Sequence, residues 1–163
     1  MIATNILYEL TFVPYDERFL ECSYVWFQDL ELRELTNNLL LVTRENQAEW
    51  FASLPSKSDY LIWGVELDQA PVGACGLKNV TSTDAEYWGY IGEKQLWGQG
   101  LGQQIVEFCL GQAKKLGLLR VWLTVNVENG RAIALYTKMG FCRVQQDSGN
   151  FVMELSTKRF STR

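Results

Sequence analysis

A glycine-rich turn between a strand-like stretch and an amphipathic stretch constrains this chain more than any other feature. The sequence runs Trp88-Gly89-Tyr90-Ile91 and, six residues on, Trp97-Gly98-Gln99-Gly100-Leu101-Gly102. Glycine has no Cβ, so this turn can adopt unusual backbone dihedrals and let a ligand approach its amides. The helix that follows begins with N–H groups that have no partner inside the helix, and the positive end of its dipole points the same way. The pattern favours binding of a phosphate or pyrophosphate, with a plain tight turn as the alternative.

Two common phosphate-binding motifs do not match this turn. A dinucleotide fingerprint reads G-x-G-x-x-G, whereas position 103 here is glutamine. A Walker loop would end in Gly-Lys followed by Ser or Thr, and this turn has no such ending. A phosphate bound here would therefore belong to another kind of cofactor.

Composition narrows the chemistry that the chain can perform. Its 163 residues suit a single domain, which we expect to span residues 1–157 with a loose tail at 158–163. The net charge of -4 argues against nucleic acid or an anionic membrane as the main partner. The chain has no histidine, which removes histidine triads and most zinc sites, and we expect no metal. Scattered cysteines, no signal-peptide pattern and no membrane-length apolar run predict a cytoplasmic protein.

Hydrophobic periodicity predicts an alternation of strands and helices. We expect strands over residues 6–13, 59–67, 72–80, 85–91, 119–127, 141–146 and 151–155. We expect helices over residues 17–26, 44–53, 100–116 and 130–138, while 29–42 is ambiguous. The expected N-caps are Asp16, Thr43 and Asn129, and Gly117 is expected to end the long helix. Trp50 and Phe51 are expected to pack in the core.

This order of elements indicates an α/β domain. The strands between residues 59 and 91 follow one another directly and predict an antiparallel meander. The glycine-rich turn then follows a central strand at its carboxyl end, which is where ligands bind in open α/β sheets.

Two motifs in the second half of the chain resemble those of the GNAT superfamily of acyl-coenzyme A dependent N-acyltransferases. The family's second motif, N-x-x-A-x-x-x-Y-x-K-x-G-F, is met at every specified position by residues 129–141. Its first motif, Gln/Arg-x-x-G-x-Gly/Ala, is met by residues 97–102, except that Trp97 replaces the Gln or Arg. Tryptophan at that position resembles the branch of ribosomal-protein N-terminal and nucleotide-aminosugar acetyltransferases. The resemblance covers residues 58–155 well and the first 55 more loosely.

The resemblance implies a GNAT-like fold and acetyl-CoA as co-substrate. The expected fold is a mixed, mostly antiparallel seven-stranded sheet with about four helices and splayed central strands, between which the pantetheine arm would lie. The amide of Ile91 or Gly92 would polarise the thioester carbonyl, and Asn129 would hydrogen-bond the pantetheine. The pyrophosphate would be held by the amides of Trp97, Gly98, Gln99, Gly100, Leu101 and Gly102.

The catalytic roles implied by the resemblance fall on few side chains. A neutral primary amine would attack the thioester directly, so positioning supplies much of the rate. Tyr136 would donate a proton to the departing sulfur; its alternative role is an aromatic core residue. Glu86 is the first candidate for the base and Glu93 the second, with a solvated surface carboxylate as the alternative for each.

The acceptor is the least constrained part of the prediction. We expect a small-molecule amine, such as a nucleotide-linked aminosugar. The alternatives are N-terminal acetylation of a protein and a non-catalytic acyl-CoA binding module. Trp26, Trp88 and Tyr90 are candidates to stack on a sugar or a base, with core packing as the alternative. Arg33 or Arg44 is the candidate partner of a diphosphate. A homodimer is left open.

Overall fold

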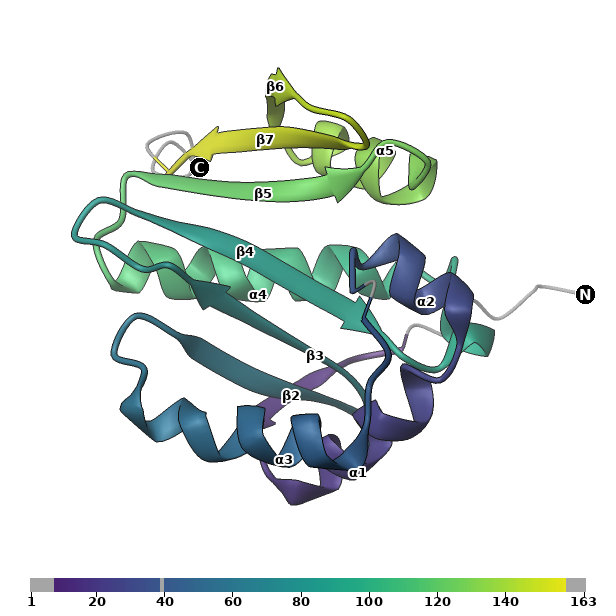
Figure 1. The fold of residues 1–163 in the computed structure, drawn as a ribbon. Helices are drawn as coiled ribbons and strands as arrows, with labels where there is room; N and C mark the ends of the chain where they lie inside the picture. Colours follow the sequence, from purple (N-terminus) through teal and green to yellow (C-terminus); the bar gives the residue numbers. More distant parts are fainter. Residues whose placement is uncertain (1–7, 39, 158–163) are drawn as a thin grey trace, which may run out of the picture.

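The computed structural model describes residues 8–38 and 40–157 and contains one seven-stranded sheet in the order β1-β2-β3-β4-β5-β7-β6 (Figure 1). The strands are β1 (Thr11–Pro14), β2 (Leu61–Leu67), β3 (Ala70–Lys78), β4 (Asp84–Ile91), β5 (Arg120–Asn126), β6 (Cys142–Gln146) and β7 (Asn150–Ser156). The α-helices are α1 (Glu17–Trp26), α2 (Leu30–Leu35), α3 (Arg44–Ser53), α4 (Leu101–Lys115) and α5 (Gly130–Lys138). Short 3-10 turns, η1 (Leu54–Ser56) and η2 (Lys94–Leu96), follow α3 and β4.

The predicted fold class is confirmed. Every strand pair is antiparallel except β4 with β5, and β2, β3 and β4 form the expected meander. The described residues hold five α-helices where about four were expected, because the ambiguous stretch 29–42 contains the short helix α2 with Asp29 as its N-cap. The predicted tail at 158–163 lies outside the described residues.

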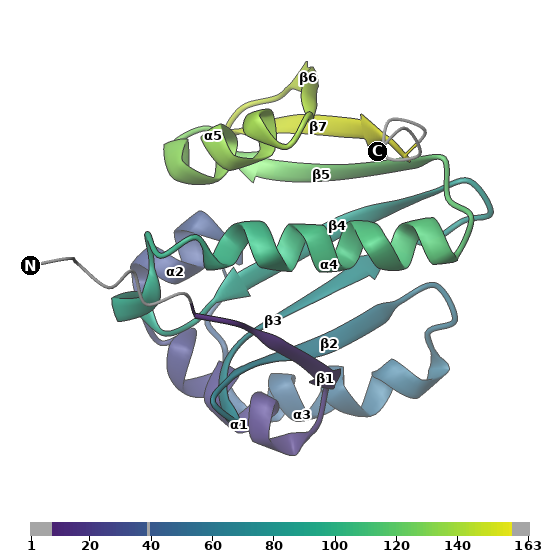
Figure 2. The same cartoon turned by 180° about the vertical axis from the view of Figure 1, so that it is seen from behind.

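The helices form one layer on each face of the sheet. Helices α1, α2 and α3 cover the face seen in Figure 1, and α4 and α5 cover the face seen in Figure 2. The core lies mainly between the sheet and α4. Hydrophobic periodicity predicts an apolar stripe of Leu101, Ile105, Cys109, Ala113 and Leu116 on this helix; the first four are buried, whereas Leu116, at the C-cap, is exposed because the helix ends there. No helix among the described residues is long and apolar enough to cross a membrane.

The predicted helix ends are confirmed by local hydrogen bonds. Asp16 accepts from the Arg18 amide, and Thr43 forms a capping box with Asn46. Asn129 accepts from the amide of Ala132, three residues on. Each bond satisfies an N–H group that the first turn of a helix leaves without a partner.

The first strand differs from its prediction. We expected residues 6–13, of which 6 and 7 lie outside the described residues, and the strand runs from Thr11 to Pro14. The chain before it is held by a side chain instead of a neighbouring strand. Gln104 of α4 accepts from the Leu10 amide at 3.0 Å and donates to the Tyr8 carbonyl at 2.7 Å. Apolar alternation predicted the extended conformation but not this partner.

The two central strands diverge, as the resemblance implied. Their parallel pairing covers only Asp84–Glu86 of β4 against Arg120–Trp122 of β5. Strand β4 continues to Ile91 and β5 to Asn126, so the strands part towards their carboxyl ends (Figure 1). This splay lies beside the first turn of α4 and opens the middle of the sheet.

Replacing Gln104 with alanine tests how the first strand is held. The change leaves the buried Leu10 amide and the Tyr8 carbonyl without their partner, so we expect the free energy of unfolding to fall by about 1–3 kcal/mol. Urea unfolding measures this value. Gln112→Ala, in the same helix, is the control, and an equal loss in both variants would contradict the assignment.

Candidate active site

A cavity of about 1210 Å³ occupies the splay and extends over the face that carries α1–α3. Residues of β4, β5, α2, α3, α5 and the amino end of α4 line it. The cavity therefore connects the glycine-rich turn with the opposite face of the sheet, where a second molecule can enter.

The open edge of β4 presents unpaired backbone groups to this cavity. The Gly92 amide donates to the carbonyl of Val72 in β3 at 2.8 Å. Because successive residues of a strand point their N–H groups to opposite sides, the amides of Gly89 and Ile91 point away from β3, into the splay. The Gly92 amide, expected as one of two candidates to polarise a carbonyl, is thus already bonded to protein. The Ile91 amide keeps the required direction.

The facing edge of β5 is open in the same way. The Val127 amide donates to the Gly149 carbonyl at 2.9 Å, so the backbone of Thr124 turns away from β7 and towards β4. Beyond the three paired residues, towards the carboxyl ends, β4 and β5 face each other with backbone N–H and C=O groups that are not paired between the strands. An extended ligand that carries amide groups can pair with both edges, as an added strand would.

The glycine-rich turn has the geometry of an anion site. Gly98 and Gly100 both have φ of +79°, a left-handed conformation that glycine adopts without strain. Among the described residues, no backbone carbonyl accepts from the amides of Gly98, Gln99 or Gly100. The amides of Leu101 and Gly102 belong to the first helical turn and have no intrahelical partner. Five consecutive amides thus remain for a phosphate, at the positive end of a 15-residue helix.

Trp97 contributes through its side chain. Its backbone amide donates to the Lys94 carbonyl at 3.1 Å. The resemblance implied that this amide would bind the pyrophosphate, but it is already bonded to protein. Its indole N–H donates to the Ile91 carbonyl at 2.9 Å. The bond ties the turn to the last residue of β4, whose amide points into the splay. The cation of Arg131 lies 5.8 Å from the Trp97 ring and adds positive charge beside the turn.

Tyr136 of α5 lies behind the splay. Its ring is 6.0 Å from that of Tyr87, edge to face. Burial raises the pKa of Tyr136 to about 12, so the phenol keeps its proton at neutral pH. The Tyr87 hydroxyl in turn lies close to Gly89, where an added Cβ would come within 2.6 Å of it. The two phenols therefore lie together at the part of the splay beside Gly89.

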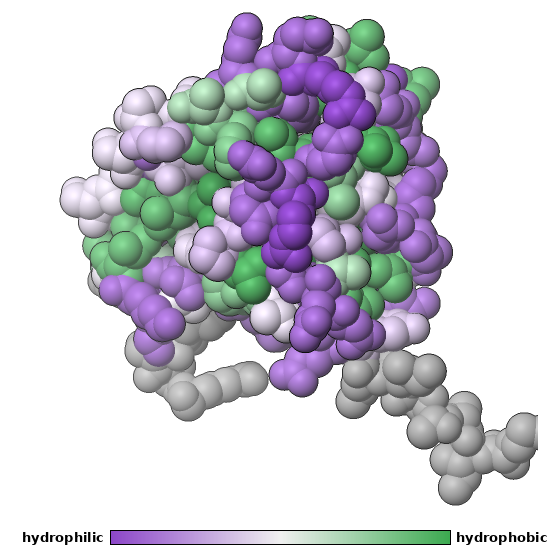
Figure 3. All heavy atoms as spheres, turned by 90° about the horizontal axis from the view of Figure 1, so that it is seen from below, coloured by the Kyte–Doolittle hydropathy of each residue, from purple (hydrophilic) through white to green (hydrophobic). Residues whose placement is uncertain are grey.

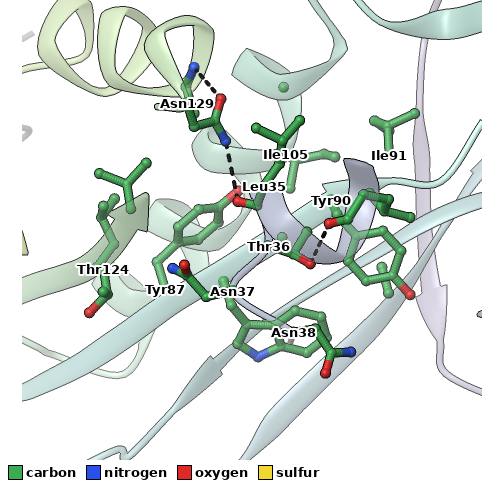
Figure 4. A pocket seen from close by; sticks show the side chains of 18 of the residues that line it. Leu35, Thr36, Asn37, Asn38, Tyr87, Tyr90, Ile91, Ile105, Thr124 and Asn129 are labelled. Atoms are coloured by element: carbon green, nitrogen blue, oxygen red, sulfur yellow. Dashed lines mark hydrogen bonds between the residues drawn. The ribbon is translucent and has the colours of Figure 1, made fainter. Parts of the chain in front are cut away.

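Asn129 bridges two elements across the cavity. Its oxygen accepts from the Ala132 amide at 3.2 Å, and its nitrogen donates to the Leu35 carbonyl of α2 at 3.4 Å (Figure 4). Asn126 makes a parallel contact of 3.3 Å with the Glu34 carbonyl. The end of α2 is thus held over the splay by two amide side chains from the β5–α5 segment.

Both candidate bases are hydrogen-bonded within the protein. Glu86 lies at the last paired position of β4, accepts from Asn79 at 3.0 Å and lies 3.6 Å from the Lys78 ammonium. Its side chain is 13% exposed and lines the cavity. Glu93 accepts from the Trp26 indole at 2.8 Å and from Gln95 at 2.9 Å. Of these two carboxylates, Glu86 lines the cavity, at the last residue of β4 that pairs with β5, whereas Glu93 is not among the lining residues.

The aromatic and basic candidates differ in whether they line the cavity. Trp88 and Tyr90 line the cavity, whereas Trp26 packs against the backbone of Gly92 and is 7% exposed. Arg44 pairs with a glutamate of α1 at 2.7 Å, and neither it nor Arg33 is among the residues that line the cavity.

Several lining residues were not predicted from the sequence. The polar side chains of Asn37, Asn38 and Thr124 face the cavity (Figure 4), and the expected core residue Trp50 lines it as well. The alternation of apolar and polar residues along β5 places Thr124 on the polar face of the strand. That alternation is the sequence pattern that could have identified Thr124 as a lining residue. The others depend on how α2 and α3 pack.

Comparisons with known proteins agree with this geometry. The family model described as Acetyltransferase (GNAT) family matches residues 13–141. Ribosomal protein bS18-alanine N-acetyltransferase of Escherichia coli strain K12 is 42% identical over 43 residues, which are 26% of this chain and 29% of that relative. The match therefore spans less than a third of the relative's length.

Solved structures share the fold over nearly the whole chain. Spermidine N-acetyltransferase from Vibrio cholerae, in complex with CoA and spermine, has a TM-score of 0.82 at 17% identity, covering 93% of this chain and 97% of the other. An aminoglycoside acetyltransferase in complex with coenzyme A has a TM-score of 0.74 at 18% identity. The alignment covers 93% of this chain and 97% of the other.

The left-handed glycines allow a matched test of the anion site. Gly100→Ala and Gly117→Ala place the same residue at φ of +79° and +75°, at opposite ends of α4, with no atom within 4 Å of either new Cβ. Both should cost about 1–2 kcal/mol of stability because of the left-handed backbone. Only Gly100→Ala should weaken coenzyme A binding in calorimetry, by about 10-fold or more, since it distorts the amide cradle. Equal affinities of the two variants would argue against the turn as the binding site.

Proposed function

This chain belongs to the acetyltransferase (GNAT) family, and we propose that it transfers the acetyl group of acetyl-coenzyme A to the primary amine of a small molecule. The observation that carries the proposal is the splay of β4 and β5, whose unpaired amides lie next to five free amides of the glycine-rich turn. Acetyl-coenzyme A combines the two groups that these features suit, a pyrophosphate and an extended arm with amide bonds.

The bound cofactor would be held mainly by the backbone. The amides of residues 98–102 would bind the pyrophosphate, with Arg131 adding charge beside them. The pantetheine would lie between β4 and β5 and pair with the backbone of Gly89 and Thr124. Bound in this way, acetyl-coenzyme A supplies an activated acyl group and a good leaving group. Asn129 borders the same passage, and its nitrogen can exchange the long Leu35 contact for a ligand carbonyl.

The chemistry then needs a positioned amine and two proton transfers. The neutral amine attacks the thioester carbon, a C–N bond forms and the C–S bond breaks. The amide of Ile91 polarises the carbonyl oxygen as negative charge develops on it. Tyr136 donates its phenolic proton to the departing sulfur. The proton lost by the nitrogen passes through water to Glu86, which lines the cavity at the point where the splay begins.

A nucleotide-linked aminosugar is the proposed acceptor class. The aromatic rings of Trp88 and Tyr90 on the acceptor side of the cavity support it. One protein of the same fold is an aminoglycoside acetyltransferase.

Acetylation of a protein N-terminus is the second candidate. It is favoured by the 42% identity with the ribosomal-protein acetyltransferase over 43 residues. That match is local, so it bears on one segment and not on the whole acceptor site.

A panel assay distinguishes the two candidates. The protein is incubated with acetyl-coenzyme A and nucleotide-linked aminosugars, spermidine or a peptide with a free N-terminal alanine, and thiol release is followed. We expect release with the aminosugars. Release with the peptide alone would favour the second candidate, and no release with any amine would contradict the proposed function.

Replacing Tyr136 with phenylalanine tests the proton donor. We expect turnover to fall about 10²-fold, the lower range for a lost general acid, while coenzyme A affinity changes less than about twofold. Because the pKa of Tyr136 is about 12, its phenol stays protonated below that pH. The wild-type rate should therefore rise from pH 7 to 10 as the acceptor amine loses its proton, with no descending limb from this group. A fully active variant would exclude the role.

A further inference from the structure

Helix α3 covers the sheet without burying any of its residues. Its outer side chains are exposed, and Figure 3, which views the molecule from the side of α1 and α3, shows hydrophilic and hydrophobic side chains interspersed there. Its inner positions Asn46, Gln47 and Trp50 line the cavity instead of packing into the core. The part of the cavity that lies between α3 and strands β3 and β4 is called the chamber here.

Aromatic rings surround this chamber in an unbroken series. Tyr15 contacts Trp50 edge to face at 5.6 Å, and Trp50 contacts Tyr60 at 6.5 Å. Tyr60 lies 6.1 Å from Trp88, which in turn lies 6.4 Å from Tyr90. The Trp88 indole rests on Gly76, where an added Cβ would come within 2.7 Å of its nitrogen. One face of that indole is therefore against the sheet, and the residue lines the cavity on its other side.

The charged groups at the chamber are compensated. Glu86 is bonded to Asn79 and lies beside Lys78, so its single negative charge is balanced by one positive charge. A linear polyamine carries several positive charges, and burying them is costly unless unpaired carboxylates compensate them. The chamber does not offer them.

The floor of the chamber also has no backbone groups free for a peptide. Strands β3 and β4 are paired continuously, from Gly73 with Ile91 to Lys78 with Glu86. An extended peptide binds by adding hydrogen bonds to an open strand edge, and the strands that line the chamber, β3 and β4, offer such an edge at the splay and not at the chamber floor. Among the described residues, the Gln47 side chain and the buried Trp88 indole N–H have no hydrogen-bond partner in the chamber. The Asn46 side-chain amide, in contrast, is bonded to Thr43 and Leu41.

We propose that this chamber, defined by Gln47, Trp50, Tyr60 and Trp88, binds the uncharged ring of the acceptor and selects aminosugars over polyamines and peptides. This inference rests on the proposed function and specifies where the acceptor is recognised. A pyranose ring presents C–H faces that pack on aromatic rings and hydroxyl groups that bond to an amide. Gln47 supplies both a donor and an acceptor for those hydroxyls. The amine then extends past Tyr90 towards the splay, where the thioester lies.

Two variants and a matched control test the chamber. Trp50→Leu removes one aromatic wall and Gln47→Ala removes the free amide, whereas Glu49→Ala changes an exposed residue of the same helix. We expect each of the first two variants to raise the KM for an aminosugar about 3- to 10-fold, the size of one aromatic or hydrogen-bond contact. The KM for acetyl-coenzyme A should stay within about twofold in all three, which also shows that the variants fold.

The outcomes separate the chamber from the proposed function. Unchanged aminosugar KM in Trp50→Leu and Gln47→Ala, or a wild-type preference for spermidine or an alanine peptide, would overturn the chamber while leaving acetyl transfer intact. If no amine is acetylated, calorimetry of a nucleotide-linked aminosugar with the wild-type protein and Trp50→Leu decides. Binding that Trp50→Leu weakens supports the chamber alone, and no binding overturns it.

Discussion

The structure depends on a strand that is paired on one edge and open on the other. Backbone donors and acceptors away from water need partners, and β4 loses its β5 partner after three residues. Its remaining length is fixed from the β3 side by continuous pairing and from behind by α4. The open edge is therefore rigid, and its unpaired groups keep a fixed direction. A fixed row of donors is what an oxyanion and an amide-bearing ligand require, because the groups need no rearrangement when charge develops.

The end of that strand and the residues after it are held by contacts from the glycine-rich turn, α1 and the start of α2. The Trp97 indole bonds the Ile91 carbonyl, the Trp26 indole bonds Glu93, and Lys94 pairs with Asp29 and Glu31 at the start of α2. The ion pairs are largely exposed and contribute little stability. Their geometric effect is larger, because they connect the phosphate-binding turn with the helices over the acceptor side. The cofactor and acceptor parts of the cavity thus share one short segment, residues 91–97.

The sequence predicted local features well and tertiary ones unevenly. Caps at Asp16, Thr43 and Asn129 and the buried stripe of α4 follow from short-range rules, and the structure confirms them. The splay is not visible in periodicity and was reached through the family resemblance. Which amides are free could not be predicted, since the bonds made by Gly92 and Trp97 depend on strand register and on η2. Trp50 was expected in the core because it is a large aromatic residue on a helix. The sequence of α3 does not show that a cavity separates this helix from the sheet.

Hydrogen exchange at individual amides tests the central claim most directly. The exchange rates of the backbone amides are measured by NMR or mass spectrometry with and without saturating coenzyme A. The account predicts new protection of Gly89, Ile91 and residues 98–102, with little change at Gly92, whose amide is already bonded to Val72. Binding that leaves the exchange of Gly89, Ile91 and the turn unchanged would contradict it.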